Sequence, residues 1–393
     1  MADSGTLENF CEQVEELGVG LCGRQAEQLR SHRELAKLQP RVVEVLRASL
    51  PTQATAQLRL IAAMARFWWM QGLGPEIAAE VEAVLARETD GVPASTVARA
   101  HQGAGELAYA RADYPTAIRY LDAAKAGFAA SAQASRESIT GQGGAANWLG
   151  MVAREQGRYD EAKAHHEEAS RHYLASSNTW GQAHAWSNLG VVAFRCGALD
   201  EALKLHTKAL SLRQEIDDLH GISSSVGNLA LVHRTRGDLA RARSMYLQSL
   251  EARELLDDRW GVAGSAVCLC VVETKLGELA AAKQHLRAAV FGFLAVGDDL
   301  GVAESAEAAL ELFVDDGDLG RGLKAYGIGL AARRLVKAPA PATEQDKHQE
   351  RVTRLVGALG AARLAEQQAW AARAEIEQVR ALLQTLVSSD RCI

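Results

Sequence analysis

Hydrophobic and polar positions recur along the chain with a period of 40 residues. Within one period, Leu199, Ala202, Leu203 and Leu210 follow the spacing of one helical face. Each apolar stretch is followed by a short polar segment with a glycine, which tolerates the positive φ of a helix C-terminus. The pattern predicts two antiparallel helices per period and six repeats, at about 99–140, 141–180, 181–220, 221–260, 261–300 and 301–340.

Four ladders of identical residues share this period. The first glycines lie in the predicted turn within each repeat, and the second glycines mark the passage to the next repeat. The leucines lie in the middle of the first helix. The alanines lie early in the second helix, where a small side chain lets two helices approach closely. The ladders are Gly157, Gly197, Gly237, Gly277 and Gly317; Gly141, Gly181, Gly221, Gly261 and Gly301; Leu149, Leu189, Leu229 and Leu269; and Ala162, Ala202, Ala242 and Ala282.

The two ends of the chain depart from the repeat. Residues 1–50 are expected to form an N-terminal helical segment, and 51–98 a degenerate helical hairpin. A polar, Pro-containing linker is expected at 337–350. It lies within a C-terminal helical cap, 341–393, for which we expect two helices, at about 345–369 and 371–388. A stack of repeats needs atypical terminal units to cover its open ends.

Composition excludes several classes of function. The formal net charge is −6 and no long basic run occurs, which argues against direct nucleic-acid binding as the main activity. No apolar run approaches the roughly 18 residues of a membrane helix, and no basic-then-apolar leader opens the chain. The six cysteines form no CxxC pair. We therefore expect a cytoplasmic protein that does not bind a membrane.

One stretch of the chain resembles the tetratricopeptide repeat (TPR). The matching residues are Asn188-Leu189-Gly190, Gly197, Asp200-Glu201-Ala202 and Leu210. The usual unit has about 34 residues, so the longer form here looks like the repeats of Pins/LGN-type adaptors and of bacterial regulators. The resemblance implies an all-α, right-handed superhelical α-solenoid, with the first helix of each repeat lining a concave groove. It also implies a scaffold that binds a protein or peptide in that groove.

The ends of the chain resemble another family. Phe67-Trp68-Trp69 within 60–76, and Leu359-Gly360 and Trp370 in the tail, are similar to the C-terminal helical region of bacterial STAND-type ATPases such as LuxR-type and SARP-type regulators. This resemblance implies the sensor arm of a signalling or transcriptional regulatory system, with an ATPase or effector subunit as a further partner. No GxxxxGK[ST] motif is present. A MalT-like sensor of a small inducer and a Rap-like receptor of a signalling peptide remain as alternatives.

The resemblance to long-repeat adaptors also implies a binding site. In such adaptors, asparagines near the motif leucine hold the backbone of an extended peptide, because a primary amide both donates and accepts. Asn147, Asn188 and Asn228 are the candidates here. Turn capping or contact with water is the alternative role.

Charged residues extend the candidate site. Arg154, Arg195, Arg234 and Lys275 lie further along the same predicted helices, where they either form a basic stripe or favour the helix C-termini. Glu307 and Glu311 make the equivalent surface of the last repeat acidic. A groove with ends of opposite charge would orient an extended ligand.

Candidate chemistry is weak. His165, His166 and His172 share a predicted helix but lack the i, i+4 spacing of two metal ligands on one face. Cys268 and Cys270 are expected to pack as small apolar groups. We therefore expect a non-enzymatic protein without a catalytic site, cofactor or metal.

Overall fold

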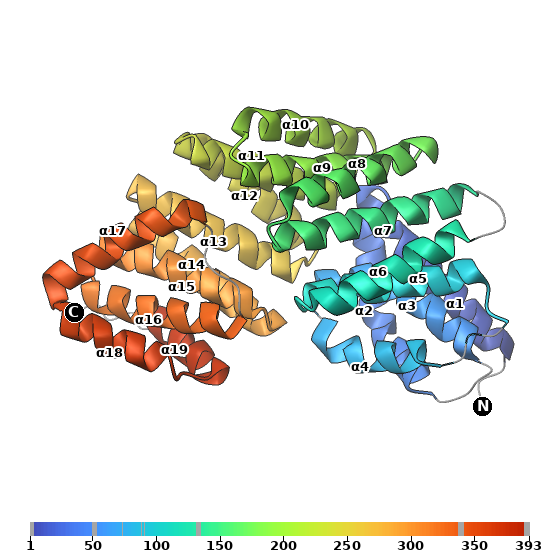
Figure 1. The fold of residues 1–393 in the computed structure, drawn as a ribbon, viewed down its shortest axis with the longest axis horizontal. Coiled ribbons are helices and arrows are strands. Elements are labelled where there is room, and N and C mark those ends of the chain that lie inside the picture. The colour runs from blue at the N-terminus through green and yellow to red at the C-terminus, as the bar shows by residue number, and fades with distance from the viewer. Residues whose placement is uncertain are drawn as a thin grey trace. The chain divides into compact units, whose positions relative to one another are not determined.

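The computed structural model describes residues 4–48, 53–72, 74–87, 89, 91–130, 135–336 and 342–388, and this part of the chain contains helices and no strand (Figure 1). The prediction of an all-α fold is confirmed. The helices are α1 (Ser4–Gly20), α2 (Gln25–Arg47), α3 (Ala54–Met70), α4 (Gly74–Leu85), α5 (Ala94–Ala110), α6 (Tyr114–Ala129), α7 (Arg136–Glu155), α8 (Tyr159–Ala175), α9 (Thr179–Arg195), α10 (Leu199–Glu215), α11 (Leu219–Thr235), α12 (Leu239–Leu255), α13 (Arg259–Leu276), α14 (Leu279–Val296), α15 (Asp299–Asp315), α16 (Leu319–Val336), α17 (Ala342–Leu359), α18 (Ala361–Ala371) and α19 (Ile376–Ser388).

Helix pairs follow the 40-residue period. From α9 to α15 the first helices begin at residues 179, 219, 259 and 299, and their partners begin 20 residues later, at 199, 239, 279 and 319. Each turn within a pair contains a glycine of the first ladder with positive φ, for example 77° at Gly277. The four ladder alanines are fully buried. Leu149, Leu229 and Leu269 are buried as well, whereas Leu189 is only half-buried.

The second glycine ladder is explained by helix capping. At the start of each first helix from α9 on, the Oδ1 of an Asn or Asp accepts a hydrogen bond from the backbone N–H of the glycine three residues later. A Cβ at Gly221 or Gly261 would lie 2.1 Å from an oxygen of the capping carboxylate, so only glycine leaves the cap its space. The pairs are Asn178–Gly181, Asp218–Gly221, Asp258–Gly261 and Asp298–Gly301, at 2.8–3.0 Å.

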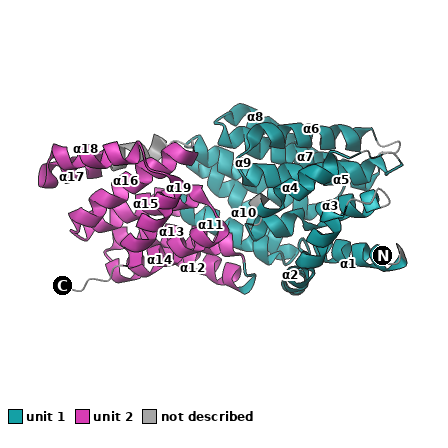
Figure 2. Cartoon of the chain, turned by 90° about the horizontal axis from the view of Figure 1, so that it is seen from below, with its two compact units in different colours: residues 1–232, 255–257 teal, residues 233–254, 258–393 magenta. Residues whose placement is uncertain are grey.

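The chain forms two compact units, shown in Figure 2: unit 1 comprises residues 1–232 and 255–257, and unit 2 comprises 233–254 and 258–393. In unit 1 the pairs α5/α6, α7/α8 and α9/α10 pack in succession, and α3 packs against α1 and α5. Leu35, Phe67 and Trp68 fill the core of its N-terminal helices. In unit 2 the pairs α13/α14 and α15/α16 pack together, and α17, α18 and α19 pack on α15 and α16.

The tail differs from the prediction of two helices. Three helices occupy 342–388, because Gly360, with φ 86°, ends α17, and a short break at 372–375 separates α18 from α19. The expected linker 337–350 is also too long, since 342–350 is already helical. Residues 337–341 lie outside the described part of the chain.

Candidate functional site

Two of the three candidate asparagines meet in unit 1. Asn188 of α9 donates from Nδ2 to Oδ1 of Asn147 in α7, at 3.0 Å, and both side chains are buried. Asn228 of α11 is half-buried, and its Nδ2 lies 3.4 Å from Oγ of Ser187. The first helices of successive repeats are therefore joined by amide contacts at the candidate positions. Their role in ligand binding remains a prediction.

Two histidines complete this polar cluster. Nδ1 of His166 lies 2.9 Å from Oδ1 of Asn147, and Nδ1 of His184 lies 3.3 Å from Nδ2 of Asn147. Burial lowers the pKa of both imidazoles well below the ordinary value, so both rings are neutral. Because Oδ1 of Asn147 can only accept, His166 donates from Nδ1. His166 was expected to be a packing residue, and this buried, neutral ring fits that expectation.

The N-terminal helices of unit 1 reach the same repeats. The guanidinium of Arg66 in α3 lies 4.9 Å above the ring of Trp180. Its Nη2 is 3.3 Å from Nδ1 of His220. Trp69 packs edge-on against Trp148 and His220, with ring centroids 6.2 Å apart in each pair. Side chains of α3 thus contact three successive repeats beside the asparagine cluster.

The expected basic residues have different surroundings. In unit 1, Arg154 donates to Oη of Tyr109 at 3.1 Å and to Oε1 of Glu155 at 2.6 Å, whereas Arg195 is exposed. In unit 2, Arg234 is half-buried, and Nζ of Lys275 lies 3.9 Å from Oε1 of Glu311. Of the residues assigned to unit 1, Arg195 is therefore the better placed to meet a ligand.

The expected acidic residues of the last repeat are ion-paired within unit 2. Glu307 receives two hydrogen bonds from Arg333 of α16, each of 2.8 Å. Glu311 is 6% exposed and lies 2.5 Å from Nη2 of Arg351 in α17. These cations compensate both carboxylates, so the role of Glu307 and Glu311 in binding stays a prediction.

Sequence reasoning missed a buried arginine that recurs every 40 residues. Arg213 is 2% exposed and donates from Nη1 to the backbone oxygen of Gly221, at 2.9 Å, and to Oγ of Ser225, at 2.7 Å. Burial lowers its pKa to about 10. Arg253, Gly261 and Ser265 repeat this arrangement in unit 2. The signal was present as further 40-residue ladders, 213/253 and 225/265, beside the glycine ladder already noted.

Two further searches bear on the type of site. Across the described residues, no group of three or more His, Cys, Asp or Glu side chains is arranged to hold a metal ion. In the same part of the chain, no helix has both the length and the apolar character needed to span a bilayer.

Comparison with protein families identifies the repeat. Tetratricopeptide repeat models match residues 181–254 and 144–171. No curated protein matches the sequence. The matched ranges contain α9, α10 and parts of α7, α8, α11 and α12, which are the helices that follow the 40-residue period most closely.

Solved structures share the fold over most of the chain. A Rap protein complexed with competence and sporulation factor is 12% identical with a TM-score of 0.62, and the match covers 97% of this chain and 98% of that one. The Rap conjugation gene regulator of plasmid pLS20, in complex with the Phr* peptide, is 16% identical with a TM-score of 0.60, covering 84% and 96%. The apo form of RapI is 13% identical with a TM-score of 0.52, covering 70% and 99%.

These likenesses concern the fold, and none of them supports the expected resemblance to STAND-type regulators. The matched repeats, the paired helices and the neighbouring structures agree with one another. The chain is a tetratricopeptide-repeat protein whose fold is similar to that of Rap proteins.

Proposed function

We propose that this chain is a non-catalytic, peptide-regulated binding protein of a bacterial regulatory system. The single observation that carries the proposal is the fold shared with two Rap structures, one with competence and sporulation factor and one with the Phr* peptide. Tetratricopeptide repeats in 144–171 and 181–254 support the same class, because stacked repeats present extended binding surfaces. This proposal favours the Rap-like alternative over a STAND-type sensor arm.

The proposed peptide site lies on the first helices of unit 1. Asn228 is half-buried and its one hydrogen bond is long, so its amide is available to pair with a peptide unit. Arg195 is exposed and would meet an acidic side chain or a terminal carboxylate of the peptide. Asn147 and Asn188 are buried against each other and would hold α7 and α9 in register beneath the ligand.

The test is a peptide selection. The full chain is immobilised and incubated with a random-sequence peptide library, and the retained peptides are sequenced by mass spectrometry. The Asn188→Ala/Asn228→Ala double variant is treated in parallel, with Gln156→Ala as the control, because Gln156 is an exposed amide at the end of α7.

We expect the wild type and the control to enrich a common motif and the double variant to lose it. If no motif is enriched, or if all three proteins retain the same peptides, the proposed site is wrong.

A further inference from the structure

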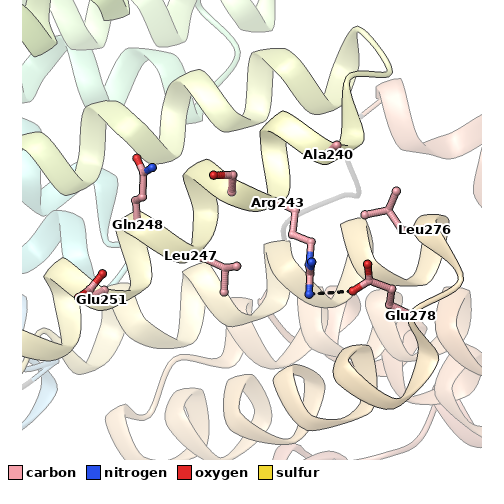
Figure 3. Close-up of a pocket in the computed structure, with 8 residues that line it drawn as sticks. Ala240, Arg243, Leu247, Gln248, Glu251, Leu276 and Glu278 are labelled. Carbon is pink, nitrogen blue, oxygen red and sulfur yellow. Dashed lines mark ion pairs between the residues drawn. The ribbon is translucent and has the colours of Figure 1, made fainter.

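A groove in unit 2 lies outside the proposed peptide site. Its volume is about 450 Å³, and it runs between α12 and the turn that joins α13 to α14 (Figure 3). Leu247 and Leu276 supply its apolar surface, and each is 38% exposed. Arg243, Glu251 and Glu278 supply its charges. Figure 3 shows Arg243 and Glu278 joined at one end and Glu251 at the other.

The two leucines depart from the pattern of the other repeats. Each first or second helix carries an equivalent position 40 residues away, and the neighbouring repeats on both sides place polar or charged side chains there. A repeat position that is polar elsewhere needs no leucine for the core of the repeat. Exposed apolar side chains that gather in a groove commonly mark a binding surface. The equivalents are Thr207 and Arg287 for Leu247, and Arg236 and Asp316 for Leu276.

The charges of the groove are held in place by a chain of ion pairs. Arg243 lies 2.8 Å from Glu278 and 3.3 Å from Glu273, through Nη2 and Nε respectively. Glu273 is 1% exposed, and its second oxygen lies 2.6 Å from Nδ1 of His285. The single cation of the groove is thus compensated by two carboxylates. This wall is formed before any partner arrives.

The remaining charge of the groove is negative. Glu251 is exposed and makes no ion pair with any residue that the structure describes. A ligand therefore meets an apolar surface between Leu247 and Leu276, with an uncompensated carboxylate at one end. The surface complements an apolar side chain followed by a cation.

We propose that this groove docks a basic amphipathic helix of a partner protein. An apolar side chain of that helix lies between Leu247 and Leu276, and a Lys or Arg one turn away pairs with Glu251. An acidic helix would bring its carboxylates against Glu251 and Glu278 and is rejected. The site is independent of the peptide site in unit 1, so the chain has two separate binding surfaces.

The test uses two labelled synthetic helices of equal length, one built from Leu and Lys and the other from Leu and Glu. Fluorescence anisotropy measures the binding of each helix to the full chain. The variants are Leu247→Thr, which introduces the residue of the preceding repeat, and Glu251→Lys. The control is Leu174→Thr, because Leu174 is 67% exposed on α8 in unit 1. Circular dichroism melting confirms that each variant folds.

We expect the Leu/Lys helix to bind the wild type and Leu174→Thr equally, and to bind Leu247→Thr and Glu251→Lys about tenfold more weakly. Glu251→Lys should gain binding of the Leu/Glu helix. Equal binding of both helices to the wild type would overturn the proposal, as would full binding to Leu247→Thr. A dimer of the wild type that Leu247→Thr dissociates, seen by sedimentation, would assign the groove to a second copy instead.

Discussion

Gln28 of α2 and Asp218, the cap of α11, lie 190 positions apart in the sequence and are joined side chain to side chain. Nε2 of Gln28 donates to Oδ1 of Asp218 at 2.7 Å, and the backbone N–H of His220 donates to Oε1 of Gln28 at 3.1 Å. Both side chains are at most 1% exposed. The first helices of unit 1 are therefore fastened to the start of α11.

Replacing Gln28 by alanine should destabilise this junction by about 1–3 kcal/mol, because a buried carboxylate and a buried backbone N–H lose their partners. Amide hydrogen exchange in α11 (Leu219–Thr235) measures the effect. Gln13→Ala, at an exposed position of α1, is the control and should change exchange little. Equal protection of α11 in both variants would contradict the role given to Gln28.

Glu106 should make stability depend on pH. Burial raises the pKa of this carboxyl from 4.5 to about 7, although Gln102 donates to it at 2.9 Å. Because the folded state holds the proton more tightly than the unfolded chain, stability falls as the pH rises from about 4.5 to 7 and stays lower above.

Glu106→Gln removes this penalty. The variant should be more stable than the wild type by roughly 2–3 kcal/mol at pH 8 and nearly equal to it at pH 4.5, in urea denaturation at both pH values. Glu12→Gln, an exposed position of α1, should show no such dependence. A difference of the same size at both pH values would show that Glu106 is ionised in the folded protein.

Gly190→Ala should destabilise unit 1 by about 1–3 kcal/mol, although alanine is the better helix former. A Cβ at this position would lie 2.7 Å from Cε1 of His206, which is 1% exposed. Gly264→Ala is the matched control, since the nearest atom that its Cβ would meet is 3.8 Å away. The control should be neutral or slightly stabilised in thermal melting. His206→Ala should relieve most of the loss at Gly190.

Ala112→Gly should stabilise the protein by about 0.5–1 kcal/mol. Ala112 takes φ 57° in the turn between α5 and α6, where the later repeats place glycine, and an L side chain is strained there. Ala164→Gly, at an exposed position in the middle of α8, should instead destabilise by about 1 kcal/mol. A loss of stability at both positions would mean that Ala112 is not strained.

The repeat could be predicted because its causes are local. A turn glycine with positive φ and a small residue at each close helix contact leave ladders in the sequence, as at Gly277 and Ala282. Leu189 shows the limit of this argument, since it has the ladder position of the buried Leu229 and yet is half-buried. Its exposure depends on how neighbouring helices cover it, which the ladder does not record.

The candidate site could be predicted only as a set of residue types. The pattern indicated Asn147 and Asn188 as neighbours on successive first helices, but not that their amides bond to each other. The pairing of Glu311 with Arg351 joins α15 to a tail helix, and no repeat spacing connects the two. Contacts of this kind depend on tertiary packing and carry no periodic signal.

The bond between Gln28 and Asp218 also limits how this protein can change in length. A stack in which each repeat touches only its neighbours tolerates the loss or gain of whole repeats. Here α2 must meet the start of α11, so the number of helix pairs between them is fixed by geometry. Deleting residues 181–220, one complete period, would leave Gln28 facing the wrong cap. Duplications in evolution or in design are therefore expected to survive only beyond α11.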